Sequence, residues 1–169
     1  MIRPILRYGE TALHQAAGRV DGITAEVRQL IDDMIQTMYA APGIGLAAPQ
    51  VGVPLRIFVA DVSVGRNPDD LITFVNPEVV DVEGSQREEE GCLSVPGFNA
   101  TVVRPSRAVL RGLGRNGQEQ TIEATGLLAR CFQHEMDHLD GMVFVDRLRG
   151  LQKDFIVRKI RKLSKSGKW

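Results

Sequence analysis

The sequence predicts an α+β fold in which mixed or antiparallel sheets pack around a central helix, with another helix near the C-terminus. Runs typical of strands gather in the middle of the chain, whereas segments with helical spacing lie before and after them. Because the two kinds of element are segregated, the pattern fits a doubly wound parallel sheet poorly. The 169 residues, 43% hydrophobic and 25% charged, predict one catalytic domain spanning 1–169.

The N-terminal third should contain an irregular arm, a helix and a loop. Residues 1–22 show no periodicity. Apolar residues at helical spacing predict a helix over 25–39, with Thr24 as its N-cap. The segment GIGLAAPQVG, residues 43–52, predicts an extended loop whose glycines let the backbone approach a ligand closely.

The middle of the chain predicts the sheets. Residues 55–60 and 71–75 are apolar and β-branched, which is typical of strands, and residues 79–82 should extend the sheet. Residues 108–113 and 120–124 flank Asn116-Gly117, a pair that strongly indicates a hairpin turn.

Two more helices are expected in the last third. The first runs over 127–139, between Thr125 as N-cap and Asp140-Gly141 as a stop. The second runs over 151–163 and carries most of a basic stretch in which Asp154 is the only acid. The whole chain has 21 basic and 21 acidic residues, so its net charge indicates no particular partner.

The first of these helices contains His134-Glu135-Met136-Asp137-His138, an H-E-x-x-H pattern. Histidines four residues apart project from one face of a helix, so both imidazoles can reach one metal ion. Glu135 is then placed to exchange a proton with a water on that metal. A pair of ordinary surface histidines is the alternative, but this pair shares an apolar stripe with Cys131 and should face inward.

A catalytic metal site needs a third protein ligand and an open fourth position. Cys92 is the strongest candidate, because it lies in a loop-like stretch between glycines. His14 stands beside no motif, and Cys131 lies in the apolar stripe, where a free cysteine usually packs as a small hydrophobe.

The chain shows no secretory or membrane signal. Its first residues, MIRPILRYGE, contain no apolar signal core, and no apolar run approaches the roughly 20 residues of a membrane span. We therefore expect a cytoplasmic protein with free or metal-bound thiols, and a monomer as the simplest assembly.

Three motifs in order resemble the signatures of the peptide deformylase family: GIGLAAPQ at 43–50, EGCLSVPG at 90–97 and QHEMDHLDG at 133–141. The resemblance extends over nearly the whole chain. It implies removal of the N-formyl group from the initiator methionine of nascent bacterial or organellar proteins, with release of formate. It also implies one divalent ion, natively oxygen-sensitive Fe(II), with Zn, Ni or Co able to occupy purified protein.

The resemblance also implies roles for individual residues. It makes Cys92, His134 and His138 the metal ligands and Glu135 the catalytic acid and base. It makes Gln50 an oxyanion donor, together with the Leu93 amide, and it has Gly45 hold the first loop close to the substrate. It places four residues around the pocket for the methionine side chain: Ile44, Glu90, Leu127 and Cys131.

Some positions leave alternatives open. Ile44 and Leu127 are equally compatible with plain core packing. Arg130 stands where some relatives carry an apolar residue, and Asn99 where some carry an arginine, so peptide binding is expected to differ in detail. The basic C-terminal helix is either a solvated face or a surface that meets the phosphates of ribosomal RNA.

Two other functions compete with deformylation. An H-E-x-x-H metallopeptidase would share His134, Glu135 and His138, but it would leave Cys92 and the GIGLAAPQ motif unexplained. A non-catalytic, ribosome-associated module with a structural metal would need a fourth protein ligand, either His14 or Cys131.

Overall fold

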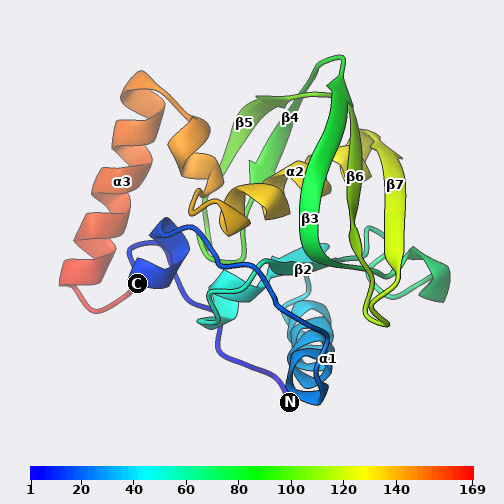
Figure 1. Cartoon of the computed structure of the whole chain (residues 1–169). Coiled ribbons are helices and arrows are strands. Elements are labelled where there is room, and N and C mark those ends of the chain that lie inside the picture. Colours follow the sequence, from blue (N-terminus) through cyan, green and yellow to red (C-terminus); the bar gives the residue numbers. More distant parts are fainter.

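A computed structural model describes residues 1–169 and shows the α+β class that the sequence predicts (Figure 1). Three α-helices are present: α1 (Ala25–Ala40), α2 (Gly126–Leu139) and α3 (Gly150–Lys165). The strands are β1 (Gly45–Ala47), β2 (Ile57–Ala60), β3 (Ile72–Glu83), β4 (Gln86–Gly91), β5 (Asn99–Arg104), β6 (Arg107–Leu113) and β7 (Glu119–Thr125). None of the helices has the length and apolar character needed to cross a membrane.

The strands form two antiparallel sheets. The larger sheet has the order β1-β2-β3-β6-β7, and β4 pairs only with β5 in the smaller sheet. Figure 1 shows α2 in the middle of the molecule, with α1 near the β2 end and α3 along the opposite side. The helix that carries the H-E-x-x-H pattern therefore lies in the interior.

Aromatic packing fixes α2 against the larger sheet. Phe58 on β2, Phe74 on β3 and Phe132 on α2 are fully buried, with ring centroids 5.5 to 5.8 Å apart. Tilted and edge-on pairs at these distances are favourable for aromatic rings. Since Phe132 stands two residues before His134, this packing also sets the position of the first histidine.

The outer helices are amphipathic. Thr24 caps the N-terminus of helix α1, since its hydroxyl accepts a hydrogen bond from the Val27 amide at 3.2 Å. The helix buries Met34 and Met38. Helix α3 buries Ile156 and Ile160 but leaves Phe155 exposed. Both helices fall within a residue or two of the ranges that periodicity predicts.

The structure corrects several boundaries. The predicted loop at 43–52 contains β1 and a 3₁₀ turn at Ala48–Val51, and residues 79–82 continue β3. Strands β4 and β5 were not predicted, because β4 is a run of charged side chains. Thr125 occupies the N-cap position of α2, but its side chain makes no capping hydrogen bond.

Candidate metal centre

Three side chains converge at the inner end of a cleft. Cys92 follows β4, and His134 and His138 lie one turn apart on α2; one donor atom from each lies within 4.8 Å of the others. Cys92 Sγ is 3.3 Å from His138 Nε2, which is 3.2 Å from His134 Nε2. One thiolate and two imidazoles suit a first-row divalent metal, so these residues fit the ion that the sequence predicts.

No fourth protein ligand accompanies them. His14 is engaged elsewhere, since its Nε2 accepts a hydrogen bond from the Gly9 amide at 3.0 Å. The buried Cys131 thiol donates to the Ile44 carbonyl at 3.4 Å, and burial raises its pKa well above the usual value. Three protein ligands with an open position are characteristic of catalytic metal sites, whereas structural sites supply four.

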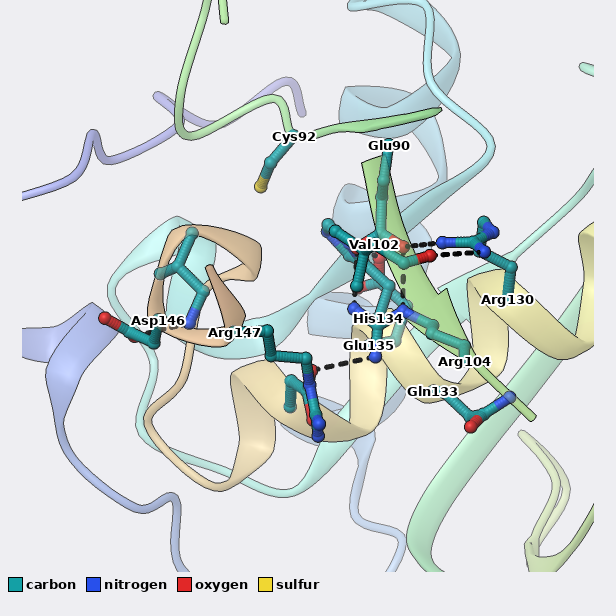
Figure 2. A network of polar contacts seen from close by, with 12 residues as sticks. Glu90, Cys92, Val102, Arg104, Arg130, Gln133, His134, Glu135, Asp146 and Arg147 are labelled. Carbon is teal, nitrogen blue, oxygen red and sulfur yellow. Dashed lines mark hydrogen bonds and ion pairs between the residues drawn. The ribbon is translucent and has the colours of Figure 1, made fainter. Parts of the chain in front are cut away.

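Glu90 orients the first histidine (Figure 2). Its Oε2 lies 2.7 Å from His134 Nδ1, which places the proton on Nδ1 and directs the lone pair of Nε2 toward the cluster. The Arg104 guanidinium donates one hydrogen bond to each oxygen of Glu90, at 2.7 and 2.6 Å, and Arg130 donates to Glu90 Oε1 at 2.9 Å. Burial alone would raise the pKa of Glu90, but the hydrogen bonds from Arg104 and His134 hold that pKa well below its usual range.

The network continues to the far side of α2. Arg104 also donates to Asp137 Oδ2 at 3.0 Å. The Arg147 guanidinium donates one hydrogen bond to each oxygen of Asp137, at 2.5 and 2.6 Å. Sequence reasoning missed Arg104, Asp137 and Arg147. The sequence pattern that could have revealed Arg104 is the alternating segment NATVVR, which ends in this arginine. The alternation places Arg104 on the buried face only if the segment is a strand, as it is in β5.

Glu135 is buried beside the cluster but is not one of its ligands. Its Oε1 is 4.0 Å from His134 Nε2, and its Oε2 has no hydrogen-bond partner within the protein. Burial raises the pKa of Glu135 to about 7. Residue 45 must be a glycine for the Glu135 carboxylate to lie here, because a Cβ at residue 45 would be 2.7 Å from Glu135 Oε1 and 2.9 Å from Cys131 Sγ. The predicted close approach of Gly45 is therefore toward the carboxylate.

Two further donors border the cluster. Gln50 is buried; its Oε1 accepts from the Ala47 amide at 2.9 Å, and its Nε2 donates to Ser94 Oγ at 3.0 Å. The same Nε2 is 3.6 Å from Cys92 Sγ, so the amide reaches the edge of the metal centre. The Leu93 amide makes no hydrogen bond within the protein. Ser94, which sequence reasoning did not single out, holds Gln50 and also donates its own amide to Cys92 Sγ at 3.4 Å.

The cluster opens into a cavity of about 450 Å³. The residues predicted to surround the methionine side chain all line it, together with Arg130; these are Ile44, Glu90, Leu127 and Cys131. Leu127 stands at the mouth, with 54% of its surface exposed, so plain core packing does not describe it. Asn99 does not line this cavity; it pairs with Gly91 across the β4–β5 ladder and borders a separate groove beside α3.

Comparison with known proteins identifies the family. The model of the polypeptide deformylase family matches residues 2–154. This chain belongs to the polypeptide deformylase family. The peptide deformylase of Acidobacterium capsulatum is 46% identical over 169 residues, covering 100% of this chain and 99% of that protein. The peptide deformylase of Xylella fastidiosa strain M12 is 50% identical over 162 residues, covering 94% of each chain.

Solved structures in the family have the same fold. The crystal structure of a peptide deformylase from Legionella pneumophila matches with a TM-score of 0.92 and 42% identity, covering 99% of this chain and 98% of that one. The peptide deformylase of Ehrlichia chaffeensis in complex with actinonin matches with a TM-score of 0.88 and 38% identity, covering 95% and 96% of the two chains. Family membership favours deformylation over the metallopeptidase and the non-catalytic module.

Proposed function

We propose that this enzyme hydrolyses the formamide bond of N-formylmethionyl peptides, releasing formate and a free amino terminus. One observation carries the proposal: a buried carboxylate with an unpartnered oxygen, Glu135, lies beside a three-ligand cluster at the inner end of an open cavity. In the proposal, Cys92, His134 and His138 hold one divalent ion, natively Fe(II). When bound, such an ion lowers the pKa of water and polarises a carbonyl oxygen.

Glu135 moves the proton. Its unpartnered Oε2 accepts a proton from the attacking water, and the same carboxyl later gives it to the departing amine nitrogen. Burial suits this exchange, because a carboxyl with a pKa of about 7 can gain and lose a proton near neutral pH.

Gln50 and Leu93 stabilise the charge that develops on the formyl oxygen. The Gln50 side chain is held in place at both its oxygen and its nitrogen, so its donor is oriented before substrate arrives. The Leu93 amide has no competing acceptor. Preorganised donors of this kind are typically worth about 3 kcal/mol each in the transition state.

In this proposal, the cavity beside the metal centre selects formylmethionine. Ile44, Leu127 and Cys131 offer apolar and soft surfaces for an unbranched thioether side chain. The formyl carbon carries only hydrogen, and Gly45 leaves little room between the backbone and Glu135 for a larger acyl group.

The test is formate release from formyl-Met-Ala-Ser by protein prepared anaerobically with Fe(II). We expect turnover that a chelator abolishes and that added Fe(II), Ni(II) or Co(II) restores. Absence of formate from folded, metal-loaded protein would overturn the proposal, and cleavage of unformylated Met-Ala-Ser would favour the metallopeptidase instead.

We further propose that the enzyme acts as a cytoplasmic monomer on chains emerging from the ribosome, with α3 as the docking surface. Helix α3 exposes basic side chains beside the exposed Leu151 and Phe155. Lys159 and Lys162 border two adjoining surface grooves there, in a position to meet RNA phosphates.

Charge reversal tests this docking without removing the buried residues of α3. We expect the double variant Lys159→Glu/Lys162→Glu to co-sediment with ribosomes severalfold less than the unmodified protein at about 0.1 M salt, since each lost phosphate contact weakens binding. Arg28→Glu, at an exposed basic residue on α1, controls for the reversal of a single charge away from α3 and should co-sediment normally. Equal co-sedimentation of the double variant would exclude α3 as the docking surface.

A further inference from the structure

Val64, in the connection between β2 and β3, has an unusual backbone conformation. Its φ is 53°, and the following Gly65 has a φ of 82°. Two consecutive residues with positive φ are typical of a tight turn in which asparagine or aspartate precedes glycine. A β-branched residue with positive φ is an outlier, because its Cβ crowds the backbone in the left-handed region.

The surrounding loop holds Val64 in this conformation. Asp61 is fully buried, and its carboxylate accepts hydrogen bonds from the Ser63 amide at 2.9 Å, the Ser63 hydroxyl at 2.7 Å and the Gly65 amide at 3.0 Å. The Tyr39 hydroxyl on α1 donates to the same carboxylate at 2.5 Å. Burial, together with the hydrogen bond to Asp61, raises the pKa of Tyr39 to about 12, so the phenol remains a donor at neutral pH.

The loop is also joined to the wall of the active-site cavity. The Asp61 amide donates to the Ile44 carbonyl at 2.8 Å, and Ile44 lines the cavity. Val64 lines the same cavity while 42% of its surface remains exposed. The hydrogen bonds to the Asp61 carboxylate thus hold the loop in a conformation that keeps the Val64 side chain at the cavity.

Depth in the cavity indicates which part of the substrate Val64 meets. The buried side chains of Gln50, His134 and Glu135 line the inner part of the cavity, where the formyl group must react. Val64 lines the same cavity but is 42% exposed, so it lies toward solvent, where the chain that follows formylmethionine must leave the cavity. A strained residue that the rest of the loop holds in place is characteristic of a ligand contact.

We infer that Val64 is a specificity-determining residue that contacts the side chain of the residue after formylmethionine. The contact is apolar, so it favours an aliphatic second residue over glycine. This inference rests on the proposed function, because it concerns the substrate of that same site.

The test compares kcat/KM for formyl-Met-Leu-Ser and formyl-Met-Gly-Ser. The variant Val64→Asn removes the apolar surface and tolerates the left-handed backbone better than valine. We expect the leucine-to-glycine ratio to fall by about fourfold, which is the effect of losing the burial of one methylene group. Relief of the strain should raise the midpoint of thermal unfolding by roughly 2–4 °C.

Val80→Asn is the matched control, since Val80 on β3 is 49% exposed and does not line the cavity. Its ratio should equal that of the unmodified protein. Val64→Gly, which removes the side chain entirely, should repeat the loss of preference. An unchanged ratio in both Val64 variants would overturn the inference while leaving deformylation intact. Failure of the unmodified protein to release formate from either peptide would instead overturn the proposed function.

Discussion

Replacing Glu135 with glutamine is expected to lower kcat/KM for a formylmethionyl peptide by roughly 10²- to 10⁴-fold, the usual contribution of a positioned acid and base. Glutamine has nearly the same shape but cannot take a proton from water and return it to an amine. The carboxylate is not among the three residues that converge as metal ligands, so the metal content of the variant should equal that of the unmodified enzyme. Formate release and metal analysis on the same sample measure the two effects.

The stability of this variant separates catalysis from folding. Glu135 is buried and its Oε2 lacks a hydrogen-bond partner, a costly arrangement for a carboxylate in the resting protein. We therefore expect Glu135→Gln to unfold at the same temperature or higher while losing activity. Glu10→Gln, at an exposed carboxylate in the N-terminal arm, controls for the loss of one charge. Activity within tenfold of the unmodified enzyme would exclude Glu135 as the acid and base.

The part of the site on α2 was predictable from sequence because it depends on local periodicity. His134 and His138 lie on one face of the helix whatever the helix packs against. Glu135 directly follows His134, so its carboxylate lies near the same metal site. From local patterns alone, Cys92 was predictable only as a candidate thiol in a glycine-flanked stretch, and the family resemblance was needed to make it a metal ligand. Its distance of 3.3 Å from His138 depends on how the segment after β4 lies over α2, which is a tertiary property.

The missed strands have a physical explanation. Strand β4 carries Arg87, Glu88 and Glu89 in succession, and charged runs usually indicate solvent-exposed loops. It is a strand because β5 pairs with it along its length and because Glu90 finds a buried partner in Arg104. That partner stands 14 residues further along the chain, so local patterns could not reveal it.

The prediction divided strand β3 into two segments, 71–75 and 79–82, for a related reason. Pro77 interrupts the apolar pattern, and proline is usually confined to strand edges or bulges. Here the pairing with β6 shifts register between Val75 and Glu78, and Asn76 takes a positive φ of 51°. The irregularity absorbs the proline, so the strand continues to Glu83.

Replacing Arg104 with methionine should destabilise the protein more than any surface change, by about 3–5 kcal/mol. Arg104 is only 2% exposed and is shared by the buried carboxylates of Glu90 and Asp137. Without Arg104, each of these buried carboxylates loses an ion-pair partner that water cannot replace. Since a domain of this size loses about 2–4 °C per kcal/mol, thermal unfolding should shift downward by roughly 10 °C.

The same change should weaken metal binding by about 10- to 100-fold, because Glu90 orients His134 only while Glu90 is itself held. Arg115→Met is the matched control. It breaks a similar bidentate contact with Asp32 at 2.8 and 2.7 Å. The side chains of Arg115 and Asp32 are 47% and 40% exposed, and ion pairs in contact with solvent are worth at most about 1 kcal/mol. Arg104→Lys should lie between them, since lysine keeps the charge but not the planar clasp. A loss of stability in Arg104→Met no larger than in Arg115→Met would show that Arg130 and Arg147 suffice to hold the two carboxylates.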